Sequence, residues 1–585
     1  MTRIRSITTF TIASLAAITA AAPALAQTTD ARIKELIRDA AARIGADQAV
    51  GGASAQGTGG MAQTGPVVPL SLDDAVKLAL DRNLDIAVQR VNPQISDIAI
   101  ANALAAYRPI VTSTVNATST STPANTTLAG SNTPGAPVIA GGNLFNGGLT
   151  QSLPWLGSSL IVQLNNNRQT TSSLNTLFNP TYNSTWSGTY TQPLMRNLFT
   201  DSTRRTIQVS KINRDISDVQ LRATIMNTVS NVRNAYWDYV FAVQSVQVAQ
   251  QSLDLANKLV QDNQTRVEVG TMAPIDVVQA QSQAATARQN LAVARQSKRT
   301  SELSLKRLIV GGTQDPNWSA QLDPTDRPDF TPVTIDLEGA IRRALADRTD
   351  LEIAKKNVEA NDVTLKFLDD QLKPQADLVA TYGAVGFGGT QLVTEGSGVN
   401  RTVTGFVPGG YADALSTLFG RGCPSSTAVA TCYPRWTLQL TFSYPIGTSA
   451  QQTSVARARV QLNQVQAQIK QIELQVATDV TNAAVTVQSN GERVQAAQAA
   501  RELAQKQLEA EQSKFEVGMS TNYNVIQSQR DLATAQNNEL QSVLNYRKAL
   551  VELERLQQTT LQNLNITILN SAGAATGGGA TTSGS

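Results

Sequence analysis

Apolar side chains recur every three or four residues along two very long stretches of the chain. The first stretch, 194–269, contains neither glycine nor proline, and the second, 448–517, is interrupted only by Gly491. The seam of the first stretch includes Val209, Ile212, Ile216, Val219, Ala223 and Met226. This spacing is that of a coiled-coil seam. The pattern therefore predicts long helices over 197–269 and 448–517.

Four shorter helical patterns accompany the long ones, over 72–108, 275–310, 337–373 and 523–556. At about 1.5 Å per residue, the long helices span roughly 110 and 105 Å, and the shorter ones roughly 50 to 55 Å each. Two short helices laid end to end therefore match one long helix. These lengths predict a cylinder of continuous and pseudo-continuous helices.

Between these helices the pattern changes from a period of three or four to simple alternation. The alternating segments are 110–115, 185–190, 376–382 and 436–442, with an additional hairpin over 149–169. Thr, Ser and Gln alternate with apolar and aromatic residues, which is typical of a sheet with one lipid face and one wet face. The sequence therefore predicts membrane-spanning strands.

The chain repeats itself. Glu268-Val269-Gly270 and the following Asp276-Val277-Val278-Gln279-Ala280-Gln281 are matched by Glu516-Val517-Gly518 and Asn524-Val525-Ile526-Gln527-Ser528-Gln529 with the same internal spacing. Each glycine follows a long helix and precedes a shorter one, so each motif is expected at the tip of a helical hairpin. The two units are expected to begin with acidic first turns at Leu72 and Leu337.

The duplication and the terminal patterns divide the chain into six segments. The expected boundaries are a signal peptide at 1–26, an N-terminal extension and linker at 27–69, a first repeat at 70–310, an inter-repeat linker at 311–334, a second repeat at 335–560 and a flexible C-terminal tail at 561–585.

The signal peptide has Arg3 and Arg5, then an uncharged run, then Ala24-Leu25-Ala26 as a small-residue cleavage site. Export is therefore expected. After it, no stretch of about 18 apolar residues follows, so any membrane insertion must use strands. The formal net charge of +3 falls to +1 when the two signal arginines are removed, which is too balanced to suggest nucleic-acid binding.

The composition restricts the chemistry. Cys423 and Cys432 lie close together in a Gly-, Pro- and Ser-rich segment, so a local disulfide is expected in an exported chain. The chain has no histidine, which removes the commonest general base and metal ligand. We therefore expect no enzyme activity, no cofactor and no metal site.

Four strands, or six with the additional hairpin, cannot close a membrane barrel, which needs at least about eight strands. The chain must therefore oligomerise. A trimer with four strands from each chain would supply about twelve strands and a water-filled lumen.

In these features the chain resembles the TolC-like outer-membrane efflux proteins. The likeness covers residues 70–560 and rests on the duplicated helix–strand–strand–helix unit, the Gln192-Pro193-Leu194 before the first long helix and the two tip motifs. It implies a fold that is all-α with a β-barrel section: a long coiled-coil α-helical barrel plus a transmembrane β-barrel shared between the protomers of a trimer, with two internal repeats.

The resemblance also implies a function. It implies an outer-membrane channel-tunnel of a tripartite efflux or type I secretion system, with its helical part in the periplasm. As a homotrimer in outer-membrane lipid, it would form a passive duct that docks on a periplasmic adaptor (membrane fusion) protein and an inner-membrane transporter. The sequence does not single out the cargo.

The family's site residues can be placed on this chain. The resemblance implies adaptor docking by Val269, Gly270 and Thr271 at the first tip and by Val517, Gly518 and Met519 at the second. It also implies a periplasmic constriction, for which the acidic candidates are Asp262, Glu509 and Glu511. Asn524 replaces the carboxylate that the first tip has at Asp276, which puts in doubt a tip link that needs an acid there.

Two other functions fit the sequence less well than an export duct. A periplasmic coiled-coil adaptor or scaffold would have one hairpin between β-rich domains, whereas this sequence predicts two hairpins. A secreted enzyme with a helical stalk would need a compact chemical domain, for which the sequence leaves no room.

Overall fold

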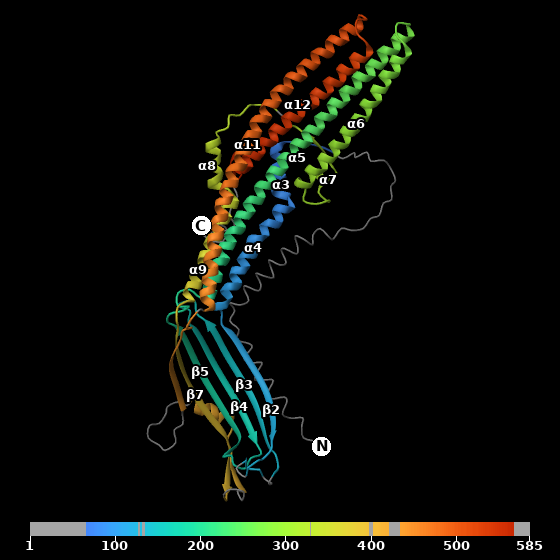
Figure 1. Ribbon diagram of the computed structural model, residues 1–585. Coiled ribbons are helices and arrows are strands. Elements are labelled where there is room, and N and C mark those ends of the chain that lie inside the picture. Colours follow the sequence, from blue (N-terminus) through green and yellow to red (C-terminus); the bar gives the residue numbers. More distant parts are fainter. Residues whose placement is uncertain are drawn as a thin grey trace, which may run out of the picture. The chain divides into compact units, whose positions relative to one another are not determined.

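The computed structural model describes residues 66–126, 129–131, 135–327, 329–396, 402–419, 433–447, 449–564 and 566. The predicted signal peptide, most of the N-terminal extension, both cysteines and nearly all of the C-terminal tail lie outside these residues. The described residues belong to one compact unit, Gly65–Ser585. Within this unit long helices lead into an antiparallel sheet (Figure 1).

Two long helices, α5 (Ser202–Glu268) and α11 (Ala450–Glu516), confirm the two predicted over 197–269 and 448–517. Each has 67 residues, or about 100 Å at the helical rise of about 1.5 Å. Each begins at a side-chain cap. The carboxylate of Asp201 accepts the backbone N–H of Arg204, and Ser449 forms a reciprocal capping box with Gln452.

The helices predicted over 72–108 and 337–373 are each broken once, so the prediction of unbroken helices is wrong. The first forms α3 (Leu72–Arg82) and α4 (Leu84–Leu104), followed by a short 3-10 turn, η1 (Ala105–Tyr107). At the break, the side chain of Asn83 accepts the backbone N–H groups of Asp85 and Ile86 and so starts a new helix.

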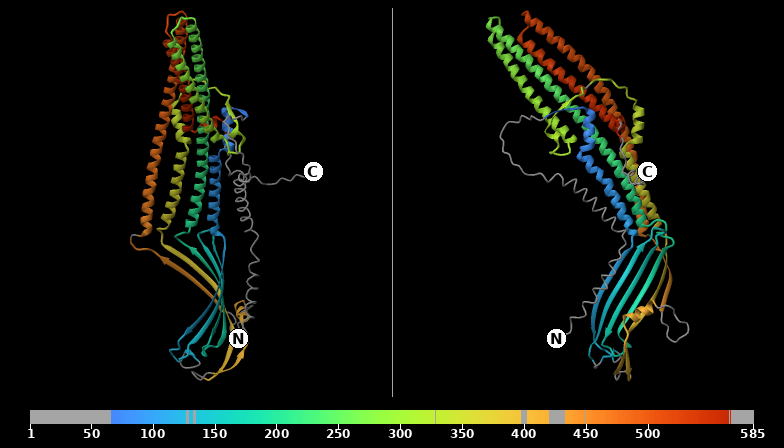
Figure 2. Two further views of the ribbon diagram at one scale, coloured as in Figure 1. Left: turned by 90° about the vertical axis from the view of Figure 1, so that its right-hand side faces the viewer. Right: turned by 180° about the vertical axis from the view of Figure 1, so that it is seen from behind.

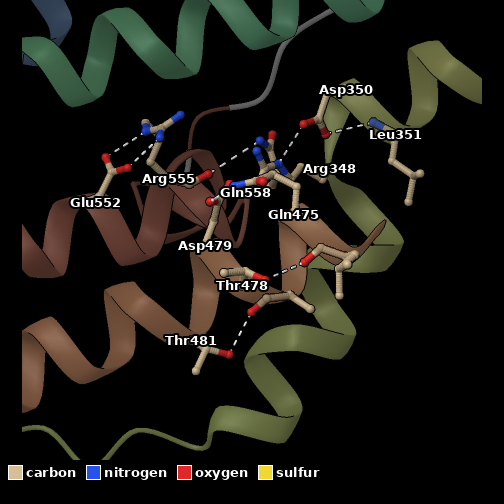
Figure 3. A network of polar contacts seen from close by, with 12 residues as sticks. Arg348, Asp350, Leu351, Gln475, Thr478, Asp479, Thr481, Glu552, Arg555 and Gln558 are labelled. Carbon is tan, nitrogen blue, oxygen red and sulfur yellow. Dashed lines mark hydrogen bonds and ion pairs between the residues drawn. The ribbon is translucent and has the colours of Figure 1, made fainter. Parts of the chain in front are cut away.

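The helix predicted over 337–373 forms α8 (Leu337–Asp347) and α9 (Thr349–Asp370), with the break at Arg348. No side-chain cap bond forms there. Instead, the guanidinium of Arg348 pairs with Asp350 at 3.0 Å and with Asp479 of α11 at 3.3 Å (Figure 3). The break in α8–α9 is therefore tied to the long helix beside it.

The helices form one layer whose order follows from their packing. Near the tips, α6 (Pro274–Ile309) packs on α5, and α12 (Asn522–Leu556) packs between α5 and α11. Nearer the sheet, α4 packs on α5, and α9 packs between α5 and α11 (Figures 1 and 2). Short helices in succession therefore accompany each long one, as their lengths predict.

The main core lies midway along α5, around Tyr236 and Tyr239, which are fully buried. It covers a parallel pair of short strands, β1 (Val67–Leu70) and β6 (Gln321–Pro324), in segments where the sequence predicts linker. The Tyr236 hydroxyl donates to the Leu70 carbonyl at 3.1 Å, and the Tyr239 hydroxyl donates to the Leu322 carbonyl. Burial raises the pKa of both phenols above their ordinary value. Two four-residue helices, α7 (Pro316–Ser319) and α13 (Thr560–Asn563), complete this region.

Among the residues that the structure describes, the sheet has seven strands. Six run side by side in the order β2 (Ile110–Thr122), β3 (Val138–Ser152), β4 (Ser159–Thr171), β5 (Phe178–Pro193), β7 (Gln375–Glu395) and β9 (Tyr433–Ser443), with every neighbouring pair antiparallel. The seventh, β8 (Thr402–Val407), pairs with the far end of β7. The strands predicted from alternation are confirmed, and the additional hairpin over 149–169 is confirmed as β3–β4.

The strand β9, at one edge of the sheet, separates apolar from polar side chains most clearly. On β9 the apolar face carries Trp436, Leu438, Leu440 and Phe442. The intervening residues Arg435, Thr437, Gln439 and Thr441 lie on the opposite face, because successive side chains of a strand alternate. All four apolar side chains are largely exposed in the single chain.

A short helix, α10 (Tyr411–Phe419), packs on β7 and β5 near the end of the sheet farthest from the long helices. Close approach depends on Gly386, where an added Cβ would lie 2.0 Å from the Ala414 carbonyl oxygen. Within the residues that the structure describes, none of the helices has both the length and the apolar character needed to cross a membrane.

Candidate functional site

The candidate site is the pair of hairpin tips at the end of the helical layer. At the first tip, Gly270 has φ +81°, a left-handed conformation that favours glycine. The N–H of Gly270 donates to the Val267 carbonyl at 2.9 Å, and the N–H of Thr271 donates to the Arg266 carbonyl at 2.8 Å. These two bonds define a Schellman motif, which ends α5 and reverses the chain.

The second tip has the same geometry. Gly518 has φ +79°, its N–H donates to the Phe515 carbonyl at 3.2 Å, and the N–H of Met519 donates to the Lys514 carbonyl at 2.7 Å. An added Cβ at either tip glycine would meet no atom within 4 Å. The glycines are therefore needed for backbone conformation, and the space in front of each turn is open.

Both tips present apolar side chains to solvent. Val269 is 72% exposed, Val517 is 71% exposed and Met519 is 76% exposed. Ile275 and Tyr523, at the starts of α6 and α12, are also exposed. The two turns therefore expose apolar surface around an open backbone, within a mainly polar helical region.

A buried polar contact joins the two hairpins just behind the tips. The amide of Asn263 on α5 donates to the Asn522 side-chain oxygen at 2.9 Å, and the Asn522 amide donates to the Asp276 backbone carbonyl at 3.1 Å. Asn263 is fully buried and Asn522 is 3% exposed. Asp276 thus takes part through its backbone, so the link between the hairpins does not need its carboxylate.

A second contact reinforces the first. The guanidinium of Arg266 lies 4.5 Å from the centre of the Phe515 ring and donates to the Phe515 carbonyl at 3.2 Å. Around these groups Leu259, Leu508 and Val525 form a small apolar core. The two hairpins therefore meet as one packed four-helix end. Sequence analysis missed these contacts, because the paired residues lie roughly 250 positions apart.

The three acidic candidates lie in different surroundings. Glu511 accepts a hydrogen bond from Lys514 and another from Ser520, each at 2.7 Å, and these bonds hold the pKa of its carboxyl below the ordinary value. Glu509 and Asp262 are exposed on their helices. Only Glu511 is therefore bonded directly to a tip. Among the described residues, no group of three acidic, histidine or cysteine side chains has the geometry of a metal site.

The comparison with protein families identifies the chain. Residues 150–311 and 414–557, about half of the sequence, match the outer membrane efflux protein family, so the chain belongs to that family. These residues include β4, β5, α5, α6, β9, α11 and α12, and therefore both tips, whereas most of β3 lies before them. The members of this family are channel proteins of the outer membrane.

Solved structures show the same fold. VceC, an outer membrane protein from Vibrio cholerae, is 14% identical, with 83% of this chain and 95% of that chain covered and a TM-score of 0.56. The CmeC outer membrane channel from Campylobacter jejuni is 14% identical, with 85% and 90% covered and a TM-score of 0.57. The MtrE channel from Neisseria gonorrhoeae, solved in its open state, is 14% identical, with 83% and 88% covered and a TM-score of 0.53. None of the curated proteins matches the chain in sequence.

Proposed function

We propose that three copies of this chain form a passive export duct, with the sheet in the outer membrane and the helices in the periplasm. The family provides the outer-membrane channel. The observation that carries the trimeric duct is the sheet, which has one apolar face and two open edges, β2 and β9.

Open edges are incompatible with lipid. Every residue of β2 and of β9 is exposed in the single chain, and each strand has a neighbour on one side only. Unpaired backbone groups cost several kcal/mol each, about 2 to 7 by transfer measurements, when no water can reach them. A sheet with an apolar face therefore has to be closed by further copies of the chain.

The helical layer has matching open edges. On α4, one side carries the exposed apolar residues Leu84, Val88, Val91, Ile95 and Ile98. On α11, at the opposite edge of the layer, one side carries the exposed residues Val460, Leu474, Val485 and Leu503. Stripes at this spacing pack against another helix. Pairing the two edges between copies would close the helices into a tube that continues the barrel.

The tips are the surface offered to a periplasmic adaptor, which would connect the duct to an inner-membrane transporter. Their exposed apolar residues and open glycine turns suit close contact with the helical hairpin of a partner. We assign this contact to Val269, Gly270 and Thr271 and to Val517, Gly518 and Met519. The alternative that this chain is itself a periplasmic coiled-coil adaptor or scaffold is less well supported, because the described residues contain two helical hairpins joined to a β-sheet.

The constriction is proposed at the same end. Three-fold repetition of Asp262, Glu509 or Glu511 would turn an inward-facing carboxylate into a ring that favours cations. No catalytic step is proposed, so the energy for transport would come from the partner transporter.

A lipid bilayer experiment tests the duct. The purified full-length protein should migrate as a particle of three 62.3 kDa chains, slightly smaller after signal removal, and should produce discrete channel openings in a planar bilayer. A monomer, or an oligomer that conducts no ions, would overturn the proposal.

Docking is tested separately by photo-crosslinking in cells. Crosslinkers at Val517 and Met519 should capture a protein that combines a coiled-coil hairpin with β-rich domains. A crosslinker at Lys77, an exposed residue on α3 away from the tips, should not. Equal capture at Lys77, or none at the tips, would contradict the assignment.

A further inference from the structure

The sheet of one chain has six strands side by side, whereas a twelve-stranded trimeric barrel would use four strands from each chain. The hairpin β3–β4 lies in the middle of the sheet, between β2 and β5, and each strand pairs along nearly its whole length with its neighbours. The six side-by-side strands have 13, 15, 13, 16, 21 and 11 residues. A tilted strand needs about 9 to 11 residues to span a membrane, so all six are long enough.

The hairpin shares the face pattern of the rest of the wall. One row of paired residues can be followed across the sheet. On one face it consists of Val111 on β2, Leu149 on β3, Val162 on β4, Tyr382 on β7 and Trp436 on β9. Of the two neighbouring rows on the opposite face, one has Gln163 paired to Gly148 and the other has Ile161 paired to Thr150. Over Leu160, Val162 and Leu164 the apolar face therefore continues across the hairpin, as expected if this part faces lipid, whereas Asn166 and Arg168 follow on the same face toward the end of β4.

The strands are also staggered as in a closed barrel. A line through paired residues starts at Ile110, the first residue of β2, and passes through Thr150, Ile161, Thr189 and Thr381 to Thr437 of β9. Thr437 lies six residues before the end of β9 at Ser443. With about 3.3 Å per residue and about 4.8 Å between strands, this stagger over five steps gives a tilt of about 40°. Membrane barrels have tilts of about 35 to 45°.

The number of strands permits closure. The strands alternate in direction, so with six strands β9 of one copy runs antiparallel to β2 of the next copy. Single-chain barrels of bacterial outer membranes have even numbers of antiparallel strands. Three copies of six strands give eighteen, with no parallel junction between protomers.

We propose that three copies of this chain close an eighteen-stranded barrel, in which the β3–β4 hairpin of each copy forms part of the wall. This inference rests on the proposed duct and specifies its exit. At about 4.8 Å between strands and a tilt of about 40°, the backbone diameter is about 36 Å, against about 24 Å for twelve strands. The exit is then wider than a twelve-stranded one and admits bulkier solutes.

Imaging of the full-length oligomer tests the strand number directly. A cross-section through the membrane region should show eighteen strands around one lumen. The size limit for polymer entry can be measured with polyethylene glycols of graded size, added only to the side of the bilayer that the barrel faces. This limit should be larger in the parent than in a variant lacking Val138–Thr171. In that variant β2 and β5 remain antiparallel, so a twelve-stranded barrel can still close.

A matched pair of substitutions tests whether the β3–β4 hairpin forms part of the barrel wall or folds into the lumen. Leu164 and Asn165 are adjacent on β4 and point to the apolar and the polar face respectively. Leu164→Arg should abolish or strongly reduce the yield of membrane-inserted trimer, and Asn165→Arg should leave it near the parental level. Equal effects, an image with twelve strands, or an unchanged polymer size limit on deletion would overturn the inference. A protein that still forms pores in those cases would retain the proposed duct function.

Discussion

The buried contact between Asn263 and Asn522 provides a quantitative test of how the two tips are joined. Replacing Asn263 by Ala removes the donor to the Asn522 oxygen, at a place where both side chains are almost inaccessible to water. The loss of a net hydrogen bond costs about 0.5 to 1.5 kcal/mol, and a buried group left without a partner costs about 1 to 3 kcal/mol. We therefore expect the tips to open more easily by about 1 to 3 kcal/mol.

Hydrogen exchange measured by mass spectrometry reports this opening. Every 1.4 kcal/mol is a factor of about ten, so backbone amides behind the tips should exchange about 5 to 140 times faster in Asn263→Ala. Amides of α4, which lies away from the tips, should exchange at the parental rate. The same segments compared in one sample provide the internal control.

The double variant Asn263→Leu/Asn522→Leu makes the test sharper. Leucine has nearly the shape of asparagine, and removing both polar partners leaves no unpaired group from this bond, so the double variant should exchange more slowly than the sum of the single effects implies. Asn522 also donates to the Asp276 carbonyl, so some cost remains. Unchanged exchange in Asn263→Ala, or strictly additive effects, would refute a buried link between the hairpins.

Two further predictions concern charged groups. Lys306→Met removes the ammonium group that lies 2.9 Å from the buried Glu302 carboxylate, so the free energy of unfolding should fall by about 3 to 5 kcal/mol. Thermal unfolding should show that adding Glu302→Leu recovers part of this stability. The lowered pKa of Glu511 means that its bond to Ser520 is complete above the ordinary carboxyl range and is lost only as the pH falls through the lowered pKa. A spin label at Met519 should therefore become more mobile only in acid, and a mobility that rises already within the ordinary carboxyl range, or that never rises as the pH is lowered, would contradict this.

The helices could be predicted because their signals are local. Absence of glycine and proline, spacing of three and four, and a glycine at each turn place α5 and α11 within a few residues of their observed ends. The breaks at Asn83 and Arg348 were missed because the apolar spacing continues across them. Asn83 is a strong helix-starting residue, so its signal was present in the sequence. Arg348 gave no such signal, because its partner Asp479 lies on a distant helix.

The sheet was predicted less completely. The hairpin over 149–169 was detected, and on β4 Leu160, Val162 and Leu164 occupy alternate positions. Most of β3, residues 138–148, was missed because Gly141, Gly142, Gly147 and other small or polar residues obscure the alternation. At the site, the tip turns were located from the glycines. Their polar links were not, since nothing in the sequence indicates which of many asparagines on two hairpins face one another.

Charged contacts along α5 explain how the helices are kept in one register. Apolar and alanine-rich seams with a spacing of three and four would tolerate a shift of one turn. Asp215 pairs with Lys356 at 3.1 Å, and Arg222 pairs with Glu352 at 2.8 Å. If α9 slid by one turn in either direction, Arg222 would face Arg348 or Lys356, and both are basic. Exposed ion pairs contribute only about 0 to 1 kcal/mol each. Their main effect is therefore to make the shifted alignments unfavourable, so that the ends of the short helices stay level with the tips and with the sheet.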